Sequence, residues 1–318
     1  MRNYIFRRLL LLPITLLFLS IFVFAMIRQV PGSVIDARLS AGFPGTANAD
    51  DRAKLEAHFG LDKPMHVQYV NWIGQVFTGD FGTSWLTKED ILDNFGRRMP
   101  VTMELLLLTL LVYVPLGIGT GVWSAVRQNR ADDYIIRSFT ILFLAVPNFW
   151  LATLVIVVPL VLWGYAPPVP YSQLWEDPAT NIVQMIVPAI ISALAGAAVL
   201  GRVARSEMLE VLRQDYVRTA YAKGLTGYVV VIRHALRNTM IPLITLIGLV
   251  FATGIAGSVI VEQIFAIPGM GRYFVQSVLT NDLPVVQVWT LVFGAAFILL
   301  NLLVDISYGF FDPRIRVQ

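Results

Sequence analysis

The chain has 318 residues, of which 56% are hydrophobic and 14% are charged. In soluble domains about a quarter of the residues are charged, so this composition excludes an ordinary soluble protein and predicts an integral membrane protein. The formal net charge of +3 is too small to indicate a nucleic-acid partner, and the absence of cysteine excludes disulfides, thiolate catalysis and cysteine-based metal sites.

Six apolar runs are long enough to cross a membrane. A hydrocarbon core about 30 Å thick requires roughly 20 residues of apolar α-helix. The runs are residues 9–27, 101–126, 135–162, 182–200, 241–261 and 288–307. Arg2, Arg7 and Arg8 precede the first run, as they would in a signal peptide. The length of this run and the absence of a small-residue cleavage site favour an uncleaved membrane anchor.

Basic residues are concentrated in alternate connecting segments. With a cytoplasmic N-terminus, the inner segments contain Arg2, Arg7, Arg8, Arg127, Arg130, Arg137, Arg202, Arg205, Arg213, Arg218, Lys223, Arg233, Arg237, Arg314 and Arg316. The short outer segments contain none between residues 163 and 181, and only Arg272 between residues 262 and 287. This asymmetry follows the positive-inside rule and predicts six spans with both termini in the cytoplasm.

Residues 28–100 form one long outer segment with helix signals of its own. Asp50 or Asp51 is expected to cap a short helix that ends at Gly60, and a second helix is expected to begin at Asp62 and Pro64. Apolar side chains recur at helical spacing in the second helix: Tyr69, Val70, Ile73, Val76 and Phe77. Such a face packs on the protein's own membrane domain, forms a docking surface for an external partner, or does both.

The sequence contains no recognisable catalytic centre. It has no phosphate-binding G-x-x-x-x-G-K-[ST] loop, and its histidines His58, His66 and His234 are too dispersed to form a metal cluster. We therefore expect no catalytic, cofactor-binding or metal-binding residues on this chain. Among the few polar residues within the spans, Asn148 and Gln184 are candidates either for lining a pathway or for helix packing. Small residues at 117, 119, 121, 193, 196 and 197 indicate close helix approach.

A basic segment, residues 201–240, separates two of the apolar runs. An amphipathic helix over residues 206–222 is expected to end at Gly224. A second short helix is expected from Thr226, with Val229, Ile232 and Leu236 as its apolar face and Arg233 and Arg237 beside it. Pro242 suits the first turn of the next span. Such an elbow at the cytoplasmic surface lies on lipid headgroups or docks on a partner.

The stretch YVRTAYAKGLTGYVVVIRHALRNTMIPL resembles the cytoplasmic loop of permease subunits in ATP-binding-cassette (ABC) importers, in the dipeptide/oligopeptide/nickel branch. The same branch is indicated by IFRRLLLLPITLLFLSIFVFAMIRQVPG, GLDKPMHVQYVNWIGQVFTGDFGTSW, AVPNFWLATLV, VEQIFAIPGMGR, NDLPVVQ and NLLVDISYGFFDPRIR, which occur in the family's order over nearly the whole chain. Of the general importer pattern, which begins Glu-Ala-Ala and has Gly four residues after the second Ala, only Ala220 and Gly224 match.

The resemblance implies an all-α polytopic membrane protein with the type I ABC importer permease fold of six transmembrane helices. It implies residues 1–27 as the N-terminal end and first span, 28–100 as an external subdomain, 101–307 as the transmembrane core with a coupling loop at 201–240, and 308–318 as a cytoplasmic tail. The expected location is a bacterial or archaeal inner membrane.

The resemblance also implies partners and roles. The expected partners are a second related permease, two ATPase subunits that hydrolyse ATP, an extracytoplasmic solute-binding protein and the lipid bilayer, with no nucleic acid. The loop residues expected to contact the ATPase are Ala220, Lys223, Gly224, Val229, Ile232, Arg233, His234, Leu236 and Arg237. The expected function is uptake of di- or oligopeptides. The alternatives are a nickel-chelate, oligosaccharide or other small-solute importer and, in another class, a secondary carrier or channel.

Overall fold

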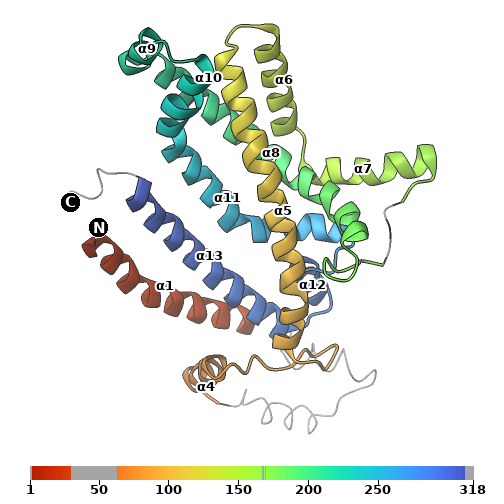
Figure 1. The fold of residues 1–318 in the computed structure, drawn as a ribbon. Coiled ribbons are helices and arrows are strands. Elements are labelled where there is room, and N and C mark those ends of the chain that lie inside the picture. Colours follow the sequence, from red (N-terminus) through yellow and green to blue (C-terminus); the bar gives the residue numbers. More distant parts are fainter. Residues whose placement is uncertain (1, 30–62, 167, 169, 312–318) are drawn as a thin grey trace. The chain divides into compact units, whose positions relative to one another are not determined.

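The computed structural model describes residues 2–29, 63–166, 168 and 170–311 (Figure 1). Within these ranges the chain is helical, apart from loops and an isolated bridge between Thr83 and Asp90. It divides into two compact units. The first unit comprises Val101–Pro268 and the chain from Leu300, and the second comprises Arg2–Pro100 and Gly269–Leu299. The expected all-α class is confirmed for the described part of the chain.

Five helices of the described part are long and apolar enough to cross a membrane. They lie in α1 (Arg2–Arg28), α5 (Ile91–Val126), α8 (Pro178–Leu212), α11 (Arg237–Ile264) and α13 (Leu283–Phe311), and the span in α11 begins in the helical turns before it, at Gly227. Each contains one of the predicted apolar runs. The agreement has a physical reason, because a helix satisfies all its backbone hydrogen bonds internally and is the spanning form open to a single apolar segment.

The third predicted run, residues 135–162, is not one straight helix. It forms α6 (Ala131–Ala145) and α7 (Asn148–Trp163), which meet at an angle of 97° (Figure 1). Val146 is extended, with φ −90° and ψ 123°, because the following Pro147 disfavours the α conformation in the residue before it. The described helices therefore give six spans only if this bent pair counts as one broken span.

Small residues let α5 and α8 approach closely within the first unit. A Cβ atom added at Gly117 would lie 2.7 Å from Leu200, and one added at Gly121 would lie 2.5 Å from the carbonyl oxygen of Gly201. Both distances are shorter than van der Waals contact, so only glycine fits. Gly119 has open space around it. The prediction of close approach thus holds for two of these three glycines. The adjoining core consists of Tyr113, Ala193, Ala197, Leu200, Ala204 and Leu243.

A buried ion pair ties the α5–α6 connection to α8. Arg205 donates to both carboxylate oxygens of Asp133, at 2.9 Å each, and Asp133 is fully buried. The same carboxylate accepts hydrogen bonds from the Ser124 hydroxyl and from the backbone N–H of Asn129. Every oxygen of this buried anion therefore has donors, which is the condition for burying a charge without a large penalty.

Asp282 organises the second unit, where it precedes α13. The Ser84 hydroxyl and the backbone N–H groups of Trp85 and Leu86 donate to its carboxylate. Beside it, α12 (Met270–Leu279) packs on the start of α13. Three aromatic rings stack there, with centroid separations of 3.9 Å and 4.3 Å: Phe274, Trp289 and Phe293. The loop over residues 78–90 is thus fixed by specific bonds.

The predicted outer helix exists as α4 (Met65–Phe77), also in the second unit. Its packed face differs from the predicted one. Tyr69 bonds to the Ser20 hydroxyl at 2.8 Å and contacts the Phe24 ring of α1, and Trp72, which was not predicted, contacts the same ring. Ile73 and Val76 are half-buried, whereas Val70 and Phe77 are exposed. The predicted helix that Asp50 or Asp51 would cap lies outside the described residues.

Candidate functional site

The expected coupling segment folds as two short helices around a turn. The first, α9, covers Asp215–Ala222, and the chain turns at Gly224, whose φ is +79°. A positive φ is strained for a residue with a Cβ atom, so glycine ends this helix as the sequence predicts. The helix predicted over 206–222 is interrupted, however, because α8 runs to Leu212 and α9 starts anew after Gln214.

The second part is mainly a π-helix. After α10 (Gly227–Val229), residues Val230–Leu236 form η1, which continues into α11 without a loop. In a π-helix, residue i is hydrogen-bonded to residue i+5. The buried side chains follow this spacing, since Val230 and Ala235 are five residues apart and fully buried; Val231 is buried beside them. The predicted face of Val229, Ile232 and Leu236 assumed α-helical spacing and holds only in part: Leu236 packs on the buried clusters and Val229 is half-buried, but Ile232 is 41% exposed. Pro242 lies inside α11 rather than opening a new helix.

Buried contacts anchor both short helices on the membrane helices of the first unit. Val217 and Ala220 of α9 cluster with Val230 and pack on Val211 and Leu212. Farther along η1, Val231 and Ala235 cluster with Met208 of α8 and Ala125 of α5. Asn238 donates to the Tyr216 hydroxyl at 2.8 Å, which adds a link from α9 to α11. The segment is therefore held on its inner side by packing and is not a loose loop.

The outer side of the segment combines basic and aromatic groups. Lys223, Arg233 and Arg237 are exposed, Tyr228 is 76% exposed, and Tyr221 is also exposed. His234 is half-buried, and its backbone carbonyl accepts a bond from Asn238. Exposed aromatic rings together with arginines are the composition of protein interfaces. The composition of this surface is that of a protein-binding interface, not of a surface that only faces solvent.

A cavity of roughly 460 Å³ lies among α5, α7, α8 and α11 of the first unit. Its lining is mostly apolar, with a few polar groups: Leu105, Leu106, Thr109, Leu144, Val146, Pro147, Asn148, Phe149, Ser192, Ala195, Val250, Gly254, Gly257, Ser258, Ile260 and Val261. Apolar walls with few polar groups are typical of small-molecule sites. The sequence candidate Asn148 lines the cavity, and its side-chain carbonyl oxygen is buried without a hydrogen-bond partner.

The second candidate, Gln184, does not line this cavity. Its side chain accepts from the N–H of Ser172 at 2.9 Å and donates to the carbonyls of Pro168 and Pro170. Tyr171 in the same loop donates to Glu104 at 3.0 Å, and its burial, with the nearby Glu104 carboxylate, raises the pKa of the Tyr171 phenol. Gln184 thus holds the α7–α8 loop, and Asn148 is the stronger pathway candidate.

A buried acid lies directly behind the cavity wall. Glu262 is fully buried, and it accepts hydrogen bonds from Thr102 at 2.7 Å and from the cavity-lining Ser258 at 3.0 Å. The sequence shows Glu262 near the end of a span, but nothing in it indicates Thr102, which is 160 positions away. The pairing of Asp133 with Arg205 was missed for the same reason. The described residues hold no group of three or more His, Cys, Asp or Glu side chains that could bind a metal ion.

Comparison with known proteins relates the whole chain to transport components. Residues 117–317 match the family of binding-protein-dependent transport system inner membrane components, and residues 1–106 match the N-terminal model of such components.

Several relatives match over almost their full length. A Brucella abortus protein, provisionally named a peptide transport system permease, is 39% identical over 95% of both chains. The Bacillus subtilis dipeptide transport system permease protein is 36% identical over all of this chain and 99% of its own. The Salmonella choleraesuis glutathione transport system permease protein is 37% identical over both full lengths. The chain therefore belongs to the family of binding-protein-dependent inner-membrane transport components, the ABC importer permeases that its sequence resembles.

Proposed function

We propose that the chain forms, with a second related permease, the membrane pathway of an importer for di- or oligopeptides. Relatives of 36% and 37% identity are named for dipeptide and glutathione transport, and both names denote small peptides. The carrying observation is the cavity among α5, α7, α8 and α11, where the Asn148 carbonyl oxygen lacks a partner.

The cavity has the chemistry that a peptide requires. Mostly apolar walls accept side chains of different kinds without specific bonds. An unpaired buried carbonyl costs about 1–3 kcal/mol, so a ligand N–H group that meets this oxygen after a turn of the Asn148 amide recovers that energy. A peptide supplies such donors in its backbone amides and its α-ammonium group. Asn148 would then orient the peptide backbone while the walls tolerate its side chains.

In this proposal the energy comes from partner subunits. Two ATPase subunits hydrolyse ATP, so this chain needs no catalytic residue and no cofactor of its own. The exposed surface of α9 and η1, with Lys223, Arg233 and Arg237, would receive an ATPase subunit on the cytoplasmic side. This requires both termini in the cytoplasm of a bacterial or archaeal cell, as the arginine distribution indicates.

An extracytoplasmic solute-binding protein would dock on the outer segment, residues 28–100. In α4, Val70 and Phe77 are exposed apolar side chains, which favours a role in docking, whereas Tyr69, Ile73 and Val76 support the helix from its packed side. Nickel chelates, oligosaccharides and other small solutes remain the alternative cargoes. A secondary carrier or channel does not fit a binding-protein-dependent family.

Uptake by the purified importer in proteoliposomes tests the proposal. We expect ATP-dependent uptake of a labelled dipeptide or tripeptide in the presence of the cognate binding protein, with no competition from nickel chelates or oligosaccharides. Asn148→Ala should reduce uptake about tenfold, because it removes one buried hydrogen bond to the peptide, and a loss of about 1.4 kcal/mol corresponds to a factor of ten. Ser192→Ala is the matched control, since its hydroxyl lines the same cavity but bonds to the Pro188 carbonyl. Uptake of a non-peptide solute alone would refute the peptide assignment.

A further inference from the structure

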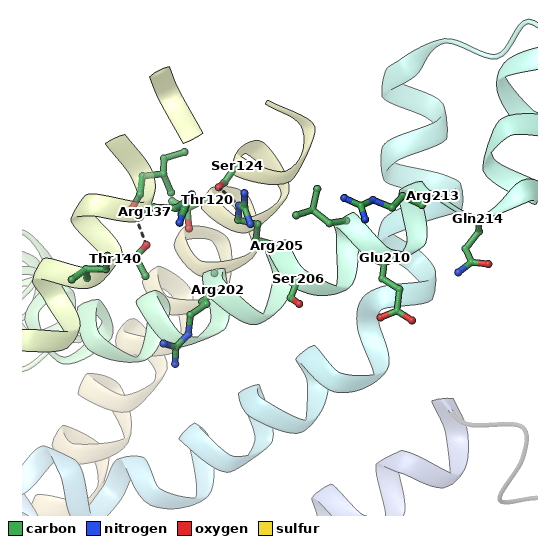
Figure 2. A pocket seen from close by; sticks show the side chains of 14 residues that line it. Thr120, Ser124, Arg137, Thr140, Arg202, Arg205, Ser206, Glu210, Arg213 and Gln214 are labelled. Atoms are coloured by element: carbon green, nitrogen blue, oxygen red, sulfur yellow. Dashed lines mark hydrogen bonds between the residues drawn. The ribbon is translucent and has the colours of Figure 1, made fainter. Parts of the chain in front are cut away.

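A second cavity in the first unit is lined by arginine side chains. It has a volume of roughly 820 Å³ and lies among the end of α5, the middle of α6 and the second half of α8 (Figure 2). Four arginines line it: Arg137 from α6 and Arg202, Arg205 and Arg213 from the α8 side. None of this belongs to the cavity that contains Asn148.

The charges in this cavity are only partly neutralised. Arg205 is held by the buried Asp133, and Glu210 is the one carboxylate in the lining. Four arginines thus face two carboxylates, which leaves an excess of two positive charges. Arg137, Arg202 and Arg213 are exposed side chains, and Arg137 lies over the ring of Tyr134. Figure 2 shows Arg202 and Arg213 at separate places on the α8 side. An arginine fork matches the oxygen geometry of a phosphate group.

An apolar groove of roughly 310 Å³ adjoins the arginine-lined cavity. The two share Thr120, Ile136 and Thr140 in their linings. The groove continues between the same three helices, along Leu116, Phe139, Phe143, Leu194, Ala197 and Ala198. A basic cavity that opens into an apolar groove is complementary to a molecule with an anionic head and a hydrocarbon tail.

We propose that this pair of cavities binds an anionic phospholipid of the surrounding membrane. Its headgroup lies in the arginine-lined cavity, and one acyl chain follows the groove past Leu116 and Phe143. Basic pockets between transmembrane helices on the cytoplasmic side are known to select anionic headgroups. A soluble anion or an acidic protein surface fits this site less well, because neither has a hydrocarbon chain that would fill the apolar groove. Because α6 contributes to both cavities, the bound lipid would brace α6 against α5 and α8.

Lipid retention by the intact permease, purified with its partner subunits, tests this proposal. We expect the complex to retain phosphatidylglycerol in preference to phosphatidylcholine, measured by native mass spectrometry after incubation with mixed vesicles. Arg202→Gln and Arg213→Gln should each weaken phosphatidylglycerol binding roughly fivefold, as expected for one arginine near a phosphate. Arg130→Gln is the matched control, since Arg130 is exposed in the same region but does not line the cavity.

The groove needs its own pair of variants. Leu116→Trp should fill the groove and reduce lipid retention, while Leu111→Trp, at an exposed position of α5 outside the groove, should not. If the parental complex retains phosphatidylglycerol and phosphatidylcholine equally, that result alone overturns the proposal. Displacement of the lipid by millimolar inorganic phosphate would assign the site to a soluble anion instead. Loss of ATPase subunits from the arginine variants, with lipid retention unchanged, would assign the surface to a protein partner.

Discussion

Arg205 and Asp133 form a bidentate ion pair, with both N···O distances at 2.9 Å, that joins α8 to the start of α6. Removing one member leaves the other charge buried or half-buried without its partner. We therefore expect Asp133→Ala to lower the free energy of unfolding by about 3–5 kcal/mol, measured by denaturant unfolding in detergent.

Two further variants separate the ion pair from a general effect of mutation. Asp133→Ala combined with Arg205→Met should lose less stability than the sum of the two single variants. Asp132→Ala removes a half-buried carboxylate that lies 3.9 Å from Arg127 and accepts a hydrogen bond from the Trp123 indole. This change should cost less than Asp133→Ala, about 1–2 kcal/mol. Additive losses in the double variant would show that the two side chains stabilise the fold independently.

The glycines of α5 give a second prediction. Gly121→Val would place a Cβ atom 2.5 Å from the carbonyl oxygen of Gly201, so α5 and α8 would have to separate. We expect little folded protein in the membrane, or a strongly lowered melting temperature. Gly119→Val, two residues away with open space around it, should give parental yield and melting temperature. Similar yields from the two variants would contradict the close approach of these helices.

The turn at Gly224 gives a third prediction, which concerns coupling. Gly224→Val must place a β-branched residue at φ +79°, at a local cost on the order of 1 kcal/mol or more. We expect near-normal membrane levels and a sharp fall in transport and in ATP hydrolysis stimulated by the loaded binding protein. Gly224→Asn should retain most activity, because asparagine tolerates positive φ. If the valine variant transports at the parental rate, the turn has no role in coupling and the segment only lies on the lipid surface.

Charge reversal at Arg237 gives a fourth prediction. Arg237 is exposed beside the buried face of η1, so Arg237→Glu should leave folding intact and turn an attraction to an ATPase subunit into repulsion. Co-purification of the ATPase subunits, followed by gel filtration, measures the effect. Arg130→Glu, at an exposed arginine outside this segment, is the control. Full retention of the ATPase by the Arg237 variant would place the contact elsewhere.

Topology gives a fifth prediction. The chain has no cysteine, so single cysteines report cleanly with a membrane-impermeant thiol reagent. Lys63→Cys, exposed just before α4, should be labelled on intact cells or spheroplasts, whereas Lys223→Cys, exposed after α9, should be labelled only after the membrane is opened. The reverse pattern, or equal labelling of both, would refute cytoplasmic termini.

Properties that depend on local sequence could be predicted well. The spans follow from apolar length, since each helix must satisfy its own backbone in lipid. The stop at Gly224 follows from the conformational freedom of a single glycine. The break at Pro147 was missed because the apolar residues continue through it, although the constraint of proline on the preceding residue was present in the sequence.

Properties that depend on tertiary structure could not be predicted. The apolar face was placed on Val229, Ile232 and Leu236 because α-helical spacing was assumed. Leu236 does pack on the core, but Ile232 is exposed, since a π-helix has no distinct sequence pattern of its own. The distant partners of Asp133 and Glu262, which are Arg205 and Thr102, are 72 and 160 positions away along the chain. Asn148 and Gln184 looked equivalent in sequence, and only their surroundings distinguish a cavity wall from a loop anchor.

The uninterrupted passage from η1 into α11 has a mechanical consequence. Leu236 and Arg237, at the junction, both have helical backbone angles, so no loop separates the exposed basic surface from the membrane helix. The same helix contributes Val250, Gly254, Gly257 and Ser258 to the cavity wall. From Val230 to Ser258 the helix is roughly 40 Å long at 1.5 Å per residue, and Pro242 lies inside it. If an ATPase subunit docks on the basic surface as proposed, a movement imposed there should reach the cavity wall through this one helix.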